Sequence, residues 1–173
     1  MAGPAPEAPA PRPNTAARHP IPVLRYADVR DLPALERLEA LCFREHPYRP
    51  EFLRWILENP RAATLVWVDG GDVEGSVMVL LENGQSRILS IAVHPDRRRN
   101  GIGRHLLAAA ERVSMERGAT VARLEVSTRN DAAIAMYRSH GYRTEGVLPR
   151  YYSWGEDAFA MRKPLDGSRG ANS

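Results

Sequence analysis

Apolar residues recur with helical spacing in four segments of the chain. Leu35, Leu38 and Leu41 fall on one stripe, and Asp31 precedes them as the expected cap of that helix. A second helix is expected to end before Pro60, and a third before Gly118. The positions that mark the remaining helices are Phe52, Trp55 and Ile56, then Ile102, Leu106, Ala110 and Val113, and finally the segment 131–139 with Gly141 behind it.

Strand-like apolar runs fill the spaces between these helices. Asp69-Gly70-Gly71-Asp72 and Asn83-Gly84 separate three consecutive runs and are typical of hairpin turns. The expected strands are residues 23–25, 64–68, 75–81, 87–93 and 121–126, with two closing strands through Tyr151-Tyr152 and residues 159–161. The order of elements predicts an α/β (α+β) fold, with about four helices layered on one mixed sheet of about seven strands.

The two ends of the chain differ in composition from the part between them. Half of the 14 prolines lie in the first 22 residues, so we expect residues 1–22 to be a disordered Pro/Ala-rich tail. Residues 166–173 are expected to be a second disordered tail, which leaves residues 23–165 as one domain.

Composition and charge narrow the class of protein. The longest aliphatic run, residues 77–81, is far shorter than the roughly 20 residues of a membrane helix. The start lacks a signal-peptide core, and the single cysteine, Cys42, excludes an internal disulfide and a cysteine-based metal cluster. We therefore expect a cytoplasmic protein without a membrane partner. A net charge of +3 is too small to indicate nucleic acid, and a clustered positive patch fits an anionic ligand equally well.

The most informative segment runs from Ile88 to Glu111. A strand ends at Val93, an arginine-rich loop follows, and Gly101-Ile102-Gly103 opens a helix. Such a junction directs backbone N–H groups and the positive end of the helix at one point, and glycines let an anion approach. These residues predict a ligand that carries phosphate. Arg104-His105 excludes a P-loop, which needs Lys followed by Ser or Thr. A glycine turn beside solvated arginines remains the alternative.

The glycine loop does not stand alone. Residues 98–103, Arg-Arg-Asn-Gly-Ile-Gly, match the (Gln/Arg)-x-x-Gly-x-(Gly/Ala) signature of the GNAT superfamily of acyl-CoA-dependent N-acetyltransferases. With the blocks downstream, the sequence resembles the RimI-type branch, which acetylates ribosomal proteins and protein N-termini. This resemblance spans residues 88–164, and only the order of elements matches over residues 23–85. The downstream blocks are Leu124-Glu125-Val126, Asn130, residues 133–137, residues 140–142 and residues 151–158.

The resemblance implies a GNAT fold and an acetyl-CoA site. In this family two neighbouring parallel strands splay apart around acetyl-CoA, and here these would be the strands that hold Val93 and Glu125. Backbone groups of the first strand would pair with the pantetheine arm, and the amides of residues 99–104 would hold the pyrophosphate. The implied cofactor-binding residues are Ile91, Ala92, Val93, Arg98, Arg99, Asn100, Gly101, Ile102, Gly103, Arg104, Asn130 and Tyr137.

The resemblance also implies catalytic roles. Glu125 would be the general base, although a strand glutamate can simply face solvent. Tyr137 would lie beside the thioester sulfur, although it can also be a core aromatic. For Asn130 a helix N-cap is the alternative to a cofactor contact. On the acceptor side the implied substrate-binding residues, which can also be ordinary packing aromatics, are Tyr48, Tyr151 and Tyr152.

Together these residues predict transfer of acetyl from acetyl-CoA to an amine. The expected acceptor is the N-terminal α-amine of a protein, such as a ribosomal protein. The alternatives are a lysine or small-molecule amine, or a CoA-binding or nucleic-acid-binding module without turnover. The histidines are scattered without metal-ligand spacing, so no metal is expected. We expect no nucleic-acid partner, and a monomer or weak homodimer.

Overall fold

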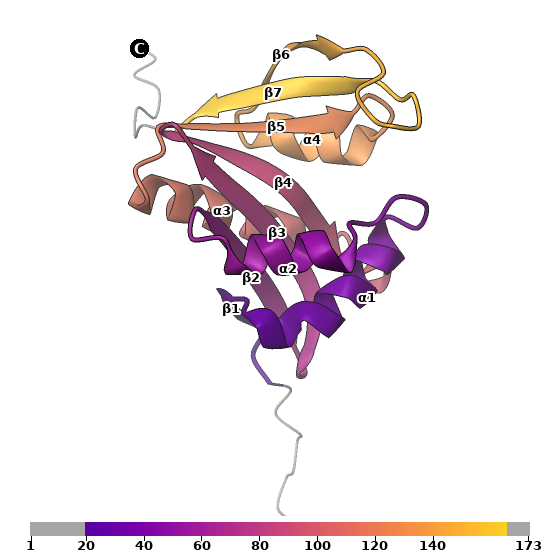
Figure 1. Cartoon of the computed structure of the whole chain (residues 1–173), viewed down its shortest axis with the longest axis vertical. Helices are drawn as coiled ribbons and strands as arrows, with labels where there is room; N and C mark the ends of the chain where they lie inside the picture. The colour runs from indigo at the N-terminus through magenta and orange to yellow at the C-terminus, as the bar shows by residue number, and fades with distance from the viewer. Residues whose placement is uncertain (1–19, 166–173) are drawn as a thin grey trace, which may run out of the picture.

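The computed structural model describes residues 20–165, which form one seven-stranded sheet with four helices packed on it (Figure 1). The strand order is β1-β2-β3-β4-β5-β7-β6, and only β4 and β5 pair in parallel. The predicted mixed α/β sheet is therefore confirmed. The expected tails fall outside the described residues, apart from positions 20–22. The strands are β1 Val23–Tyr26, β2 Ala62–Asp69, β3 Asp72–Glu82, β4 Gln85–Val93, β5 Val121–Ser127, β6 Arg143–Leu148 and β7 Ala158–Pro164.

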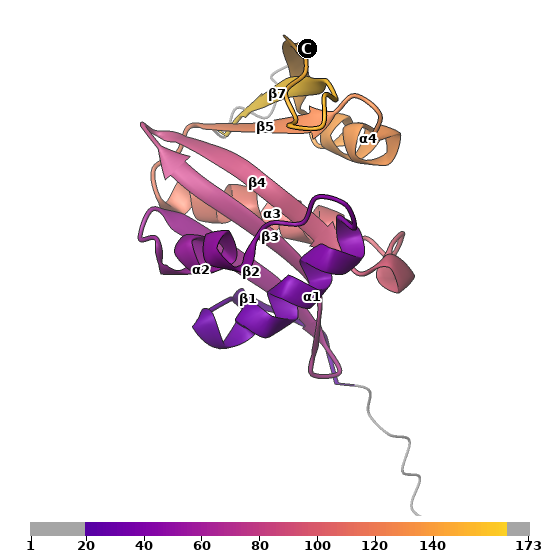
Figure 2. The same ribbon diagram turned by 45° about the vertical axis from the view of Figure 1, so that its right-hand side comes forward.

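The helices cover both faces of the sheet (Figure 2). α1 (Leu32–Cys42) and α2 (Pro50–Glu58) bury Leu35, Leu53 and Ile56 against Val66 and Met78 on one face. On the other face lie α3 (Ile102–Glu116) and α4 (Asp131–Ser139). Their buried side chains include Leu106, Leu107, Val113 and Ile134, which pack with strand residues such as Val77, Leu124 and Met161. Apolar burial on each face stabilises the sheet by roughly 25 cal/mol per Å² of surface removed from water.

The closing strands differ from the prediction. β6 is Arg143–Leu148, whereas Tyr151 and Tyr152 lie in the connection between β6 and β7. β6 forms the edge of the sheet and is mostly exposed, so its sequence shows no alternation of apolar and polar residues. The second closing strand was placed correctly, because residues 159–161 lie within β7.

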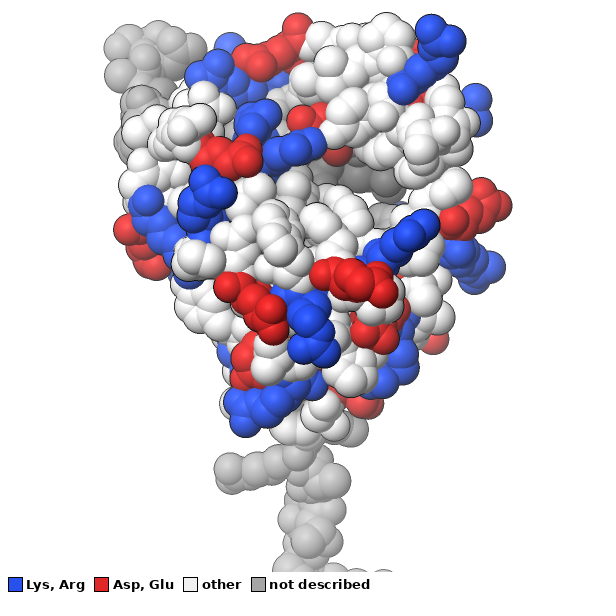
Figure 3. Space-filling view, viewed as in Figure 1, with Lys and Arg blue, Asp and Glu red and all other residues white. Residues whose placement is uncertain are grey.

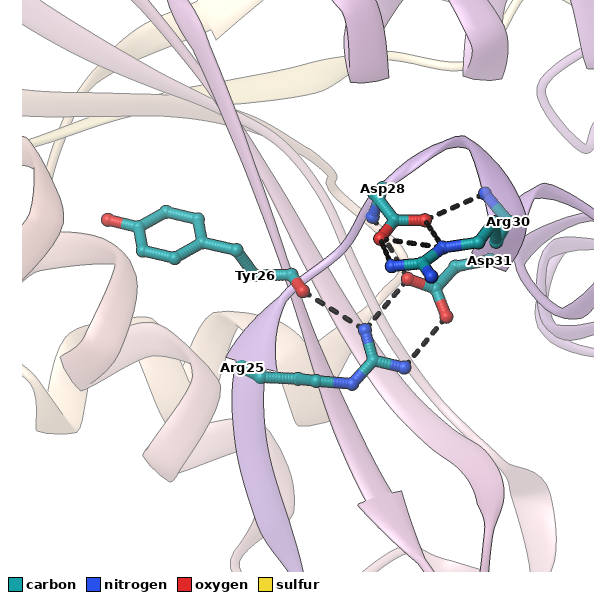
Figure 4. Close-up of polar contacts among 5 residues, drawn as sticks. All are labelled: Arg25, Tyr26, Asp28, Arg30 and Asp31. Atoms are coloured by element: carbon teal, nitrogen blue, oxygen red, sulfur yellow. Dashed lines mark hydrogen bonds and ion pairs between the residues drawn. The ribbon is translucent and has the colours of Figure 1, made fainter.

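Two expectations for α1 are also corrected. The buried stripe continues from Leu35 through Leu38 and Glu39, while Leu41 is 44% exposed and lies off it. Asp31 precedes α1 without a side-chain cap bond, because a 3₁₀ turn at Val29–Asp31 comes first and Asp28 caps that turn. The Asp31 carboxylate instead accepts two bonds of 2.8 Å from the Arg25 guanidinium (Figure 4).

The Arg25–Asp31 pair ties β1 to the start of α1. Hydrogen bonds from Arg25 hold the pKa of Asp31 below its usual range. A carboxyl whose pKa is depressed by folding contributes stability above its unfolded pKa, and that contribution is lost as pH falls through the folded value.

Asp31→Asn should therefore lower the free energy of unfolding at pH 7 by about 1 kcal/mol, since Arg25 is partly exposed. The difference from wild type should shrink toward pH 3. Urea unfolding at both pH values measures it. Arg30→Gln breaks a pair in which Arg30 is 88% exposed, and it serves as the control. Equal losses in the two variants would contradict the prediction.

Candidate active site

The site begins where β4 and β5 stop pairing. Their parallel ladder joins Gln85–Ile88 to Val121–Leu124 and goes no further. In the neighbouring pair, Met78 opposes Ser90 and Val79 opposes Ile88, which leaves Leu89 as an extra residue in β4. Such a bulge bends the strand that contains it. β4 therefore turns away from β5 directly after their last shared pair, as the diverging ribbons show (Figure 1).

A cavity of about 1080 Å³ lies beyond this point, between the end of β4 and the helices α3 and α4. Its walls are the end of β4, the loop after it, the first turn of α3 and one side of α4. Main-chain groups on the β5 side of residues 89–93 have no strand beside them, so they can pair with an extended ligand. The space-filling view also shows a hollow between the β5–β7–β6 part of the sheet and the rest (Figure 3).

The first turn of α3 presents free amides to the cavity. Gly101 is its N-cap with φ of 79°, a conformation that favours glycine, and it has no side chain to cap the helix. The N–H groups of Ile102, Gly103 and Arg104 thus lack intrahelical acceptors and lie at the positive end of the helix. Arg98 and Arg99 add positive charge on the cavity wall. This arrangement fits a pyrophosphate.

Arg97 takes a different role from its neighbours. Its guanidinium lies 3.6 Å from Asp69 and 3.5 Å from Glu74, both in the β2–β3 hairpin. These ion pairs attach the arginine loop to the sheet, so part of the positive charge in the loop is compensated.

α4 supplies two of the predicted cofactor residues. Asn130 accepts a bond of 3.2 Å from the Ala133 amide, which confirms the N-cap interpretation, and it also lies on the cavity wall. Tyr137 belongs to the buried core and lines the cavity as well. Burial raises the pKa of Tyr137, so its hydroxyl stays protonated at neutral pH.

Every predicted cofactor-binding residue lines the cavity except Asn100. The Asn100 amide instead donates to the Arg97 carbonyl at 3.3 Å. Several wall residues had no predicted role in cofactor binding, although three of them lie in the block 133–137, because only helix geometry shows which side chains face the cavity: Cys42, Phe43, Ala132, Ala133, Ala135 and Met136. The Cys42 thiol donates to the Val93 carbonyl at 3.2 Å, and burial raises its pKa, which makes it a poor nucleophile.

Glu125 lies on the α1/α2 face of the sheet, because its neighbours Leu124 and Val126 are in the opposite core. It is neither free in solvent nor on the cavity wall. Its Oε2 accepts a bond of 3.0 Å from Arg87 Nε, and Arg87 Nη2 donates to the Tyr151 hydroxyl at 2.7 Å. From sequence, Arg87 is expected only as the first residue of a strand, without a role at the site.

The predicted substrate-binding tyrosines gather around Glu125. Tyr48 donates to the Leu89 carbonyl at 3.1 Å, and Tyr152 packs edge-on against Tyr151. Burial raises the pKa of Tyr48 and of Tyr152 to about 12, and the Glu125 carboxylate adds to both shifts. Tyr152 is also close enough to affect the pKa of Tyr137, so this region meets the cavity there.

An aromatic stack that includes the exposed Trp154 lies beside Tyr152. His46, between α1 and α2, stacks on Trp154 at 3.7 Å between ring centroids, and Trp154 stacks on Tyr152 at 4.6 Å. The loop after α1 and the connection before β7 therefore touch each other. Trp154 lies in the block 151–158 that the resemblance places on the acceptor side, whereas His46 had no predicted role of its own. The contact between the two was not predicted, because they are distant in sequence.

Glu39 connects α1 to the same region. It is 1% exposed, accepts a bond of 3.0 Å from Ser90 Oγ, and accepts a longer bond of 3.4 Å from the Tyr48 amide. Burial raises its pKa. Glu39 thus attaches both the bulged part of β4 and the backbone of Tyr48 to α1.

Two further properties concern residues 20–165 as a set. They contain no group of three or more His, Cys, Asp or Glu side chains arranged to hold a metal ion. None of their helices is long and apolar enough to cross a membrane.

Comparison with known proteins identifies the family. Residues 29–142 match the acetyltransferase (GNAT) family. The chain belongs to this family. An N-alpha-acetyltransferase of Sulfurisphaera tokodaii is 33% identical to this GNAT acetyltransferase over 156 residues, covering 82% of the chain and 92% of the relative. A putative ribosomal protein bS18-alanine N-acetyltransferase of Bacillus subtilis is 29% identical over 139 residues, covering 80% and 92%.

A solved structure agrees with these relatives. The ribosomal-protein-S18-alanine N-acetyltransferase of Escherichia coli superposes with a TM-score of 0.78 at 27% identity, covering 88% of this chain and 99% of that one. The predicted GNAT fold and the resemblance to the RimI-type branch are confirmed. This GNAT acetyltransferase is an acetyl-CoA-dependent N-acetyltransferase.

Gly103→Asp should abolish CoA binding in a folded protein. A side chain there meets Met136 Sδ at 3.2 Å, and its negative charge opposes the field at the start of α3. Isothermal titration with CoA measures the affinity. Gly146→Asp is the control, because a side chain at Gly146 meets nothing within 4 Å. Equal CoA affinity in the two variants would place the phosphate site elsewhere.

Proposed function

We propose that this enzyme acetylates the N-terminal α-amine of proteins. The observation that carries the proposal is the contact between His46 and Trp154, which joins the loop after α1 to the connection before β7. Behind this contact lie Tyr48, Tyr152 and Glu125. We take this contact to narrow the approach to Glu125, which suits the free end of a chain, whereas a lysine within a folded protein needs an open groove. The same acceptor is supported by the relatives, which are named as an N-alpha-acetyltransferase and as ribosomal-protein alanine N-acetyltransferases.

A single carboxylate is a sufficient base for the acetylation of an α-amine. With a reference pKa near 7.7–8.0, roughly a tenth of α-amines are neutral at pH 7, against about 0.04% of lysines. Glu125 serves as the general base, directly or through a water. The amine nitrogen forms a bond to the thioester carbonyl carbon, the carbon–sulfur bond breaks, and the amine proton passes to Glu125.

Tyr137 provides the proton for the departing sulfur. Tyr137 lines the cavity, and its hydroxyl stays protonated at neutral pH because burial raises its pKa. Tyr137 transfers this proton to the thiolate of CoA. Glu125 then releases the amine proton to solvent, and solvent reprotonates the phenol, which restores both groups. No covalent intermediate on the enzyme is required, which agrees with the raised pKa of the Cys42 thiol.

Peptides with a free α-amine should be acetylated much faster than peptides whose only amine is a lysine. Release of CoA thiol from acetyl-CoA measures the rate, and mass spectrometry locates the acetyl group. Each peptide with a free N-terminus and no lysine is matched by an N-terminally blocked peptide with one internal lysine. Faster acetylation of the blocked lysine peptides would favour the lysine alternative, and no turnover with any peptide or small amine would favour a binding module.

Glu125→Gln should keep CoA affinity and lower kcat by about 100- to 10,000-fold, because it removes the proton acceptor and preserves the shape. The residual rate should climb with pH as the amine loses its proton unaided. Initial rates from pH 6 to 9.5 on a peptide that wild type acetylates measure this effect. A rate within about threefold of wild type across that range would show that Glu125 is not the base.

A further inference from the structure

Arg87 makes contacts that join three separate segments of the enzyme. It lies in β4, its Nε donates to Glu125 in β5 at 3.0 Å, and its Nη2 donates to Tyr151 before β7 at 2.7 Å. The Arg87 and Glu125 side chains are only 31% and 15% exposed. A partly buried arginine with two separate acceptors is held more firmly than a surface ion pair.

The sheet register explains why Arg87 reaches toward the site. Arg87 opposes Arg123, which opposes Arg162, which in turn opposes Arg143. Like charges on adjacent strands repel, and three of these four guanidinium groups lie beside an acid. Arg123 pairs with Glu82 at 3.0 Å, and Arg162 lies 3.6 Å from Glu145.

For Arg87 the available acid is Glu125, two residues beyond Arg123 on β5. Main-chain pairing of β4 with β5 ends one residue after Arg87, at Ile88 and Leu124. The Arg87–Glu125 pair therefore crosses the place where the two strands begin to separate.

These contacts leave one carboxylate oxygen of Glu125 available. Oε2 is occupied by Arg87, whereas Oε1 has no hydrogen-bond partner within residues 20–165. The planar guanidinium fixes the directions of its two bonds, so the orientation of Glu125 and the position of Tyr151 depend on each other.

We propose that Arg87 is a positioning residue for the acceptor amine. It orients Glu125 so that Oε1 receives the proton, and it holds Tyr151 at the entrance. This inference rests on the proposed function, in which Glu125 is the general base. It predicts that loss of Arg87 lowers kcat through Glu125 and raises KM for the peptide through Tyr151.

The test compares Arg87→Gln and Arg87→Lys in wild type and in the Glu125→Gln background. Arg87→Gln should lower kcat about tenfold or more, the scale of a lost charge-assisted hydrogen bond, and should also raise peptide KM. KM for acetyl-CoA should stay unchanged, since Arg87 is not on the cavity wall. In Arg87→Lys the positive charge remains, but the planar guanidinium with its two separate donors is lost. The kcat should therefore recover in part, while the KM for the peptide stays raised.

The double variant shows whether Arg87 affects kcat through Glu125. In the Glu125→Gln background, Arg87→Gln should change kcat less than twofold while peptide KM still rises. Arg123→Gln is the matched control, because Arg123 occupies the opposing position and pairs with Glu82, away from Glu125 and Tyr151. Its kcat and KM values should equal those of wild type.

Each of the other outcomes would contradict one specific part of the proposal. One such outcome is that Arg87→Gln lowers kcat by the same factor in wild type and in the Glu125→Gln background, together with a lower melting temperature or weaker acetyl-CoA binding. That result would show that Arg87 only stabilises the fold. Wild-type kcat in Arg87→Gln, with a slow Glu125→Gln enzyme, would reject the positioning role and leave the proposed base intact. Wild-type rates in Glu125→Gln itself would reject the base and the inference together.

Discussion

The separation of β4 from β5 after Ile88 and Leu124 determines the position of everything else at the site. Because the two strands part, β4 has backbone groups that can pair with an extended ligand, and α3 and α4 border a cavity instead of closed core. The bulge at Leu89 supplies the bend, and Tyr48 and Glu39 hold the bulged segment from the other face. In the proposed reaction, cofactor and acceptor would approach a shared point from the two faces of one sheet.

Much of the candidate cofactor site was predictable from the sequence, because its residues are close together in the chain and each acts through local geometry. A strand, a glycine turn and a helix occur in consecutive order over residues 88–111, and that order alone places free amides at a helix start. The N-cap role of Asn130 was also predictable, since N-cap residues are recognised from one or two neighbours in the sequence. The element order likewise predicted the sheet, its hairpins and its helices.

The acceptor half depends on contacts between distant residues, which no local pattern records. Arg87 and Tyr151 are 64 positions apart, and His46 and Trp154 come from opposite ends of the domain. β6 was misplaced for a related reason, since an exposed edge strand does not need the apolar alternation by which strands are recognised. Leu41 was assigned to the core because spacing alone does not show that Glu39 occupies the inner position.

The last of the described strands lies inside the sheet, not at its edge, since β7 is inserted between β5 and β6. β6 pairs with no strand other than β7 among the described residues. During synthesis, the chain therefore cannot attach β6 or bring Tyr151 to Arg87 until residues 158–164 have emerged. Contacts between residues that are far apart in the sequence form slowly during folding. The enzyme should thus become competent only after β7 has been synthesised, and a short truncation within β7 should be far more damaging than its length suggests.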